Sequence, residues 1–432
     1  MRKILVFWMA ILLVFSSFTQ VPVLANSAET SNLELETSRT LFSLTEARTV
    51  EVQADFGELV DLDELQFQFG GKNLSEWKKW SGGTNYNGAP FITVVEEPHF
   101  VDDTSVVKAT LQFDLPFDTT NLSNRTIRIQ YQQLIGNYEL ALINTVSGQK
   151  AATNVKLNVY DEFLFYEEIK HAIDEVFAQA EANDRYLKYE VAGQSVEGRD
   201  IHFVTLAKDE AAVNKYLNET LPTALEDPSS LLEKIENGTI GDYQIPIWIN
   251  NIHPDEVEGV DAQVELLREF ALEEEITFTT QDPTTKEETE VTLNVDEVLD
   301  DVIFLYLFTS NPDGRVANTR ANANGFDLNR DNAYQTQVET QQVNELIAKW
   351  TPLSFIDMHG YVNGFLIEPT TPPHNPNFEY DLLHGNMINQ AHAMGQAGIG
   401  QSNLDSYFIP KLEWEDGWDD MTPAYTAVFS ML

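Results

Sequence analysis

The stretch that decides the fold is residues 250–259, which read Asn-Asn-Ile-His-Pro-Asp-Glu-Val-Glu-Gly. It follows a short apolar run, Ile245–Ile249, and leads into a segment with the apolar spacing of a helix, Val260–Leu272. His253 and Glu256 are three residues apart, so at the start of a helix their side chains can point to one side. An imidazole and a carboxylate placed in this way can bind one divalent metal ion if a third ligand comes from elsewhere.

The same pattern also fits a solvated helix start, where acidic residues are favoured by the helix dipole. The apolar run before His253 favours the metal interpretation, because ligands of α/β sheets bind just beyond the C-terminal ends of strands. Residues 355–360, Phe-Ile-Asp-Met-His-Gly, repeat the arrangement of an apolar strand followed by a histidine. We therefore predict that His253, Glu256 and His359 meet at the ends of adjacent strands. The alternative for His359 is a capping histidine that binds no metal.

A third polar block, residues 309–315, follows another apolar run and reads Thr-Ser-Asn-Pro-Asp-Gly-Arg. Its Asn-Pro-Asp-Gly segment is typical of a turn. The arginines at and after this block, Arg315 and Arg320, are suited to bidentate capture of a carboxylate or an oxyanion. They could equally neutralise nearby acidic side chains.

From Tyr160 onward, segments with strand and helix patterns alternate. This alternation predicts an α/β domain with a largely parallel or mixed central sheet flanked by helices. The expected helices are 163–181, 211–217, 260–272 and 337–350, and the expected strands are 201–206, 245–249, 302–308 and 354–358. Residues 273–297, which are acidic and rich in threonine, are expected to form a surface hairpin or loop.

The segment before Tyr160 has a different pattern of short alternating runs separated by turn residues. The seven expected strands are 49–54, 65–69, 91–95, 106–113, 127–133, 138–143 and 156–160. This number and spacing predict an all-β sandwich of the immunoglobulin-like type over residues 26–158. We interpret it as an accessory domain in front of a catalytic domain at 159–432. Folding aid, surface attachment and wall binding remain alternative roles.

The composition excludes some partners. The 432-residue chain has 26 basic and 69 acidic residues, a net charge of −43. Such a surface repels nucleic acids and anionic lipid headgroups, so neither is expected as a partner. The chain has no cysteine. A metal ion could therefore be held only by histidine, aspartate and glutamate.

The first 25 residues have the pattern of a signal peptide. Arg2 and Lys3 precede an apolar run, 4–14, and Val23-Leu24-Ala25 offers a cleavage site with a small residue. The run is shorter than the roughly 20 apolar residues of a spanning helix. We therefore expect export to the extracellular space and no membrane span after the signal is removed.

Taken together, these blocks resemble the zinc carboxypeptidase family, the metallocarboxypeptidases of the funnelin type. The resemblance runs from about Tyr160 to the last residue and includes residues 193–201, Gly-Gln-Ser-Val-Glu-Gly-Arg-Asp-Ile. It implies one zinc ion held by His253, Glu256 and His359. It further implies the following roles: Arg320 polarises the scissile carbonyl, Asn329 and Arg330 bind the free C-terminal carboxylate of a peptide, and Asp327 orients a ligand imidazole.

The resemblance thus implies an exported enzyme that hydrolyses C-terminal residues of peptides with a zinc-activated water. One part departs from the family pattern, because its general base is a glutamate on a late strand. Glu368, Glu413 and Glu415 do not sit in such a context, so we expect a catalytic domain truncated at its C-terminus. Two alternatives remain open, an inactive peptidase-like protein that binds zinc or peptides, and a related zinc hydrolase acting on cell-wall peptides or N-acyl amino acids.

Overall fold

The structure is a computed structural model of the 432-residue chain. It describes residues 33–102, 104–119, 124–181, 184–360, 365–367 and 380–409, the last with side chains from residue 385 onward. The predicted signal peptide, residues 1–25, lies outside these ranges. Within them, none of the helices combines the length and the apolar character that crossing a bilayer requires.

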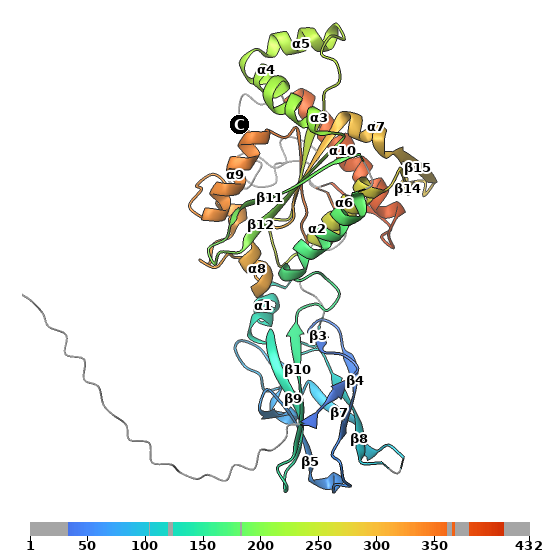
Figure 1. The fold of residues 1–432 in the computed structure, drawn as a ribbon, viewed down its shortest axis with the longest axis vertical. Helices are drawn as coiled ribbons and strands as arrows, with labels where there is room; N and C mark the ends of the chain where they lie inside the picture. Colours follow the sequence, from blue (N-terminus) through green and yellow to red (C-terminus); the bar gives the residue numbers. More distant parts are fainter. Residues whose placement is uncertain are drawn as a thin grey trace, which may run out of the picture.

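Residues 33–158, the β region, form two sheets around a shared core (Figure 1). One sheet has the order β1 (Leu33–Glu34), β10 (Lys150–Asn158), β9 (Gly136–Asn144), β5 (Leu65–Phe69) and β6 (Lys72–Asn73), and β3 (Leu41–Ser43) also pairs with β10. The other has the order β2 (Glu36–Thr37), β4 (Arg48–Asp55), β8 (Val106–Phe113) and β7 (Ile92–Phe100). Two 3-10 turns, η1 (Leu62–Glu64) and η2 (Leu74–Glu76), border β5 and β6.

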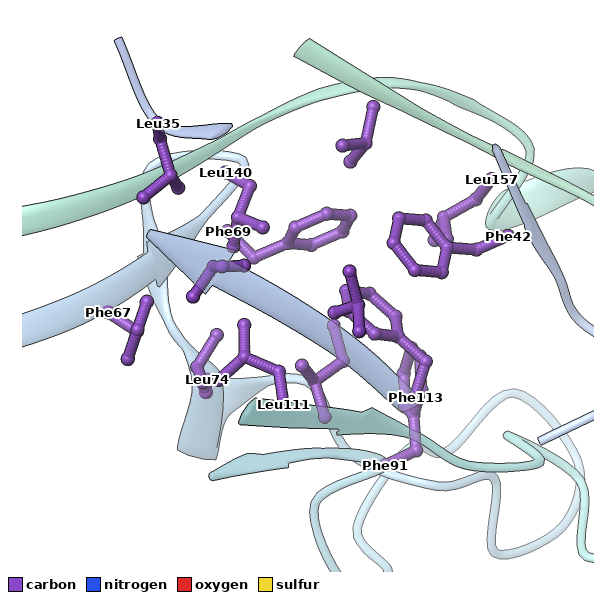
Figure 2. Packing of buried hydrophobic residues seen from close by; sticks show 14 of the residues in the cluster. Leu35, Phe42, Phe67, Phe69, Leu74, Phe91, Leu111, Phe113, Leu140 and Leu157 are labelled. Carbon is purple, nitrogen blue, oxygen red and sulfur yellow. The ribbon is translucent and has the colours of Figure 1, made fainter. Parts of the chain in front are cut away.

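The core of the β region follows from strict alternation along its strands. In β8 every second residue is buried, because successive side chains of a strand point to opposite faces. Figure 2 shows the aromatic side chains that meet between the sheets. The ring of Phe113 from β8 stacks on Phe42 from the other sheet at 4.1 Å and meets Phe69 edge-on at 5.5 Å. The immunoglobulin-like type of this two-sheet arrangement stays a prediction.

One predicted strand of the β region is wrong. Residues 127–133 form a short helix, α1 (Arg125–Arg128), followed by a 3-10 turn, η3 (Tyr131–Gln133). The side chain of Asn124 starts the helix by accepting a hydrogen bond from the backbone N–H of Thr126 at 3.0 Å. Ile127 and Tyr131 are buried four residues apart, which is helical spacing.

Residues 159–409 contain a mixed central sheet, as predicted, and are called the α/β region. Its order is β11 (Tyr186–Gln194), β12 (Asp200–Ala207), β16 (Val302–Leu307), β13 (Ile245–Asn250) and β17 (Ser354–Asp357). Strands β16, β13 and β17 are parallel, whereas β11 and β12 are antiparallel to their neighbours. Both faces of β16 are covered, since Leu305 packs in one core and Phe304 and Tyr306 pack in the other.

Helices cover the two faces of this sheet (Figure 1). The helices of the α/β region are α2 (Tyr166–Ala180), α3 (Glu210–Lys215), α4 (Leu221–Glu226), α5 (Pro228–Glu236), α6 (Glu258–Leu272), α7 (Val295–Asp301), α8 (Pro312–Ala317), α9 (Val338–Trp350) and α10 (Tyr380–Gly400), with a π-helical turn η4 (Tyr216–Thr220) and a 3-10 turn η5 (Leu328–Arg330). Residues 275–294 form the expected hairpin, β14 (Glu275–Gln281) with β15 (Glu288–Asn294), and β18 (Phe365–Leu366) pairs with β19 (Tyr407–Phe408).

The block expected as a turn at residues 311–314 begins a helix instead. Asn311 accepts a hydrogen bond from the backbone N–H of Gly314 at 2.9 Å, and Pro312 occupies the first position of α8. The side chain of Asn311 therefore caps the start of α8. Pro312 suits the first helical position because proline has no backbone N–H that would need a hydrogen-bond acceptor. The helices at 221–236 were not predicted.

Candidate metal and substrate site

Parallel pairing of β13 with β17 brings the two predicted ligand segments together. Asn250, the last residue of β13, lies opposite Asp357, the last residue of β17. His253 and His359 follow these strand ends at the same edge of the sheet. As expected for an α/β sheet, the polar residues gather beyond the C-terminal ends of the strands.

The three predicted ligands form a compact cluster. One ligand atom from each of His253, Glu256 and His359 lies within 4.8 Å of the other two. The Nδ1 atoms of the histidines are 2.9 Å apart, and the two carboxylate oxygens of Glu256 lie 3.2 Å from His253 Nδ1 and 3.0 Å from His359 Nδ1. His253 and Glu256 are almost fully buried, whereas His359 is partly exposed. The cluster is therefore open on the side of His359.

Hydrogen bonds hold the backbone around this cluster. The carboxylate of Asp357 accepts from Asn250 Nδ2 at 2.9 Å and from the N–H of Ile252 at 3.1 Å, and its other oxygen lies 2.9 Å from His359 Nε2. The buried side chain of Asn251 donates to the carbonyls of Glu256 and Met358, at 3.0 Å each. The loop after β13 and the end of β17 are thus tied to each other on both sides of the ligands.

Arg320 and Asp327 lie against the cluster. The guanidinium of Arg320 is 3.1 Å from His253 Nδ1 and 3.4 Å from Glu256 Oε1, and its Nε donates to Asp327 at 2.7 Å. The second oxygen of Asp327 lies 3.4 Å from His253 Nε2. A cation therefore faces the ligand cluster, and the carboxylate that fixes this cation also lies beside the imidazole of His253.

The charges of the cluster stabilise one another. Burial opposes ionisation of Glu256, but hydrogen bonds from His253 and His359 hold the pKa of its carboxyl well below the usual range. Desolvation acts against protonation of His359, yet the carboxylates of Asp357 and Glu256 raise its pKa to about 10. Asp327 is likewise desolvated, and its pKa is lowered by His253 and Arg320. Glu256 and Asp327 are therefore carboxylates at neutral pH.

The residues predicted to bind a peptide carboxylate, Asn329 and Arg330, follow Asp327 closely in the sequence. Asn329 is buried in η5, and the exposed Arg330 donates from Nη1 to the carbonyl of Asn329 at 2.7 Å. Arg315 is buried, donates to the carbonyls of Val257 and Leu164 and lies 3.3 Å from the carboxylate of Asp261, so it neutralises an acid and anchors the backbone rather than captures a ligand. Glu368, Glu413 and Glu415 lie outside the described residues.

The donor set fits a zinc ion. Two imidazoles and one carboxylate are a ligand set of catalytic zinc sites, which leave one position open. The buried His253 Nε2 makes no hydrogen bond within the described residues, and the exposed edge at His359 leaves access to the cluster. His253, Glu256 and His359 are the residues that would hold the ion.

Two features of the site had not been predicted. Asp357 stands two residues before His359, and its place at a strand end beside a histidine is a signal that the sequence contains. The second feature is long-range: Arg128 of α1, in the β region, lies 3.4 Å from Asp255. No local pattern around Arg128 indicates that contact.

The chain is similar in sequence to a known protein family and in structure, at low scores, to several solved proteins. The family model of zinc carboxypeptidases matches residues 173–397. Similar solved structures include a metallo-carboxypeptidase from Burkholderia cenocepacia (16% identity, 79% of this chain and 67% of that chain, TM-score 0.36). Others are carboxypeptidase A from Helicoverpa armigera (14%, 74% and 75%, 0.37) and a metallo-carboxypeptidase from Pseudomonas aeruginosa (13%, 93% and 83%, 0.38). No curated protein matches the sequence. Because the family match spans more than half of the 432 residues, the chain belongs to the zinc carboxypeptidase family.

Proposed function

We propose that this protein is an exported zinc carboxypeptidase that removes C-terminal residues from peptides. The observation that carries the proposal is the convergence of His253, Glu256 and His359, with ligand atoms within 4.8 Å of one another. The family match to zinc carboxypeptidases supports the same assignment. The substrate class is a peptide or protein with a free C-terminus.

The chemistry divides between the ion and the protein. Zinc, when bound, supplies Lewis acidity and makes a water molecule a better nucleophile at neutral pH. Arg320 would donate hydrogen bonds to the oxygen on which negative charge develops, and the position of its guanidinium against the ligand cluster supports this role. Asp327 fixes the direction of that guanidinium through its 2.7 Å hydrogen bond. Both groups are charged before substrate arrives.

Asn329 and Arg330 are the proposed carboxylate clamp. A guanidinium binds a carboxylate through two parallel N–H donors, and a neighbouring amide can add a third. Arg330 is exposed, and one of its nitrogens donates to the carbonyl of Asn329, which limits its orientation. This clamp would restrict the enzyme to the end of a peptide chain.

Zinc content and peptide binding test the proposal together. We expect about one zinc ion per wild-type chain at neutral pH and a large loss in His253→Ala. Peptides with a free C-terminus should bind the zinc-loaded wild type more tightly than their amides, and Arg330→Ala should remove most of that difference. Arg268→Ala, which removes a partly exposed charge from α6, is the matched control. Equal zinc content in wild type and His253→Ala, or no preference for free C-termini, would overturn the proposal.

The organisation around the site is also proposed. Residues 1–25 act as an export signal, residues 26–158 form an immunoglobulin-like accessory domain, and residues 159–432 form the peptidase domain. The division is supported by separate hydrophobic cores in the β region and the α/β region. N-terminal sequencing of the protein recovered from the medium of expressing cells tests the export signal. A mature chain that still begins at Met1 would contradict it.

A further inference from the structure

A cleft lies where the β region meets the α/β region, beside the candidate metal site. It has a volume of about 260 Å³. Figure 1 shows α1, at the end of the β region, next to α8. Arg125, Arg128 and Ile129 line the cleft from the β region, and Arg320 and Asp327 line it from the α/β region. Arg320 and Asp327 also lie 3.1 Å and 3.4 Å from His253, so two residues of the cleft wall border the ligand cluster.

The position of α1 at this cleft is fixed by an ion pair between the two regions. Arg128 Nε lies 3.4 Å from the carboxylate of Asp255, and both side chains are largely buried. Asp255 stands directly before Glu256 in the loop that carries two of the proposed ligands. The β region is therefore attached to the metal-site loop itself.

The charges that line the cleft do not cancel. Asp255 is matched by Arg128, and Asp327 is matched by Arg320. Arg125 also lines the cleft and is exposed, and its guanidinium makes no hydrogen bond or ion pair with any described residue. The guanidinium of Arg125 is thus available to bind an anionic ligand. The chain has 69 acidic and only 26 basic residues, so an arginine without an acidic partner is unusual in it.

An apolar wall lies beside this cation. Ile129 is 53% exposed although it is a large aliphatic residue, and it lines the same cleft. A side chain with a short aliphatic stem and a carboxylate can contact Ile129 and bind Arg125 at the same time. Glutamate has this combination, and its carboxylate would form an ion pair with the guanidinium of Arg125.

We propose that α1 of the β region forms a substrate subsite in which Arg125 binds an acidic side chain of the peptide, upstream of the C-terminal residue. The inference rests on the proposed carboxypeptidase function, since it assumes that a peptide lies across the ligand cluster. It assigns the β region a direct part in choosing the substrate.

Two peptides and one substitution test the subsite. The probes are an N-acetylated pentapeptide with a free C-terminus and two glutamates before its last residue, and the same peptide with glutamines. Their dissociation constants are measured by calorimetry on the zinc-loaded full chain at low ionic strength. Wild type should bind the glutamate peptide about threefold to fivefold more tightly, which is the range of an ion pair open to solvent on one side. Arg125→Gln should bind both peptides equally.

Further variants make the result specific to Arg125. Arg125→Lys should keep part of the preference for the glutamate peptide. The positive charge remains, but lysine lacks the planar guanidinium that binds a carboxylate through two hydrogen bonds. Arg125→Glu should reverse it. Arg268→Gln removes the same charge from the partly exposed Arg268 of α6 and should leave the preference unchanged. A preference that survives in Arg125→Gln, or that Arg268→Gln removes to the same extent, would overturn the subsite.

The outcome also separates this inference from the proposed function. If wild type binds the glutamine peptide and not its amide, the carboxypeptidase proposal stands, and only the comparison with the glutamate peptide decides the subsite. If wild type does not distinguish the glutamine peptide from its amide, the proposed function fails and the subsite fails with it.

Discussion

The guanidinium of Arg128 lies 3.4 Å from the carboxylate of Asp255, and this pair joins the β region to the loop of the candidate metal site. The pKa of Asp255 is raised by desolvation, an effect that Arg128 opposes. A carboxylate with this little contact with water depends on a nearby cation to stay charged. The β region is therefore part of the electrostatic environment of the site.

Removal of Arg128 should destabilise the protein. We expect Arg128→Met to lower the free energy of unfolding by about 3 kcal/mol, because it leaves a buried carboxylate without its cation. The double variant Arg128→Met with Asp255→Asn should recover a large part of this loss. Arg268→Met breaks a solvent-accessible pair with the exposed Glu265 and should cost less than about 0.5 kcal/mol. Urea unfolding of the four proteins measures these differences, and equal losses in the two single arginine variants would refute the prediction.

Replacement of Asp357 should weaken zinc binding without abolishing it. Asp357→Asn removes the negative charge 2.9 Å from His359 Nε2 but keeps the shape of the side chain. Loss of such a supporting carboxylate costs about 10–100-fold in metal affinity. A competition titration with a chelator measures the change.

Asp313→Asn is the matched control for that experiment. Asp313 accepts hydrogen bonds from Ser195 Oγ at 2.6 Å and Arg199 Nη1 at 2.7 Å, so it ties the turn between β11 and β12 to α8. Its replacement should lower stability and leave zinc affinity within about twofold of wild type. Equal zinc affinity in Asp357→Asn and wild type would show that Asp357 does not support a ligand.

Gly259 should tolerate no side chain. A Cβ atom at this position would lie 2.8 Å from Asn251 Nδ2 and 2.9 Å from Met358 Cβ, both of which are fixed beside the ligand cluster. We expect Gly259→Ala to cost about 1–3 kcal/mol in unfolding free energy and to reduce zinc affinity. Gly385, which is exposed in α10, has open space around its Cβ position, so Gly385→Ala should stabilise by about 0.5–1 kcal/mol. Thermal unfolding of both variants checks the opposite signs.

Stability should fall in mild acid because of His202. Burial lowers its pKa to about 4, so between the ordinary value of 6.5 and about 4 the unfolded chain binds a proton that the folded protein does not. The stabilisation from neutral His202 is thus fully present above pH 6.5 and is lost as pH falls toward 4. The loss from this residue should reach about 3 kcal/mol.

His202→Gln isolates this contribution. Glutamine can still bond to the hydroxyl of Tyr189, which lies 2.9 Å from His202 Nδ1, but it does not titrate. The difference in unfolding free energy between wild type and variant should therefore shrink or reverse from pH 7 to pH 4. A difference that stays constant over that range would show that His202 does not cause the loss.

Local patterns predicted the elements that carry the proposed ligands. The apolar run before His253 forms β13, and the helical spacing after Gly259 forms α6. The 15-residue helix is long enough for its periodicity to be distinctive, whereas the six-residue strand is indicated by its continuous apolar run and its short length. The meeting of His253 with His359 followed from a general rule about strand ends in α/β sheets, and the structure brings the two residues together.

The sequence did not predict α1, and the reason is physical. Ile127, Ile129 and Tyr131 alternate with polar residues, which fits a strand, while burial of Ile127 and Tyr131 with exposure of Ile129 fits a helix. Over so few residues the pattern matches both the two-residue period of a strand and the 3.6-residue period of a helix. Whether the segment becomes a strand or a helix then depends on the Asn124 cap and on tertiary packing. The contact of Arg128 with Asp255 could not be predicted, since it joins residues far apart in the sequence.

The pairing of β13 with β17 has a consequence for how the protein is made. His253 and His359 are 106 residues apart, so at about 5–20 residues per second the ribosome releases them about 5–20 s apart. During this interval a nascent chain holds two of the three proposed ligands and lacks the strand that positions the third. Metal retention would then coincide with docking of β17, which makes it a marker for completion of the central sheet during synthesis.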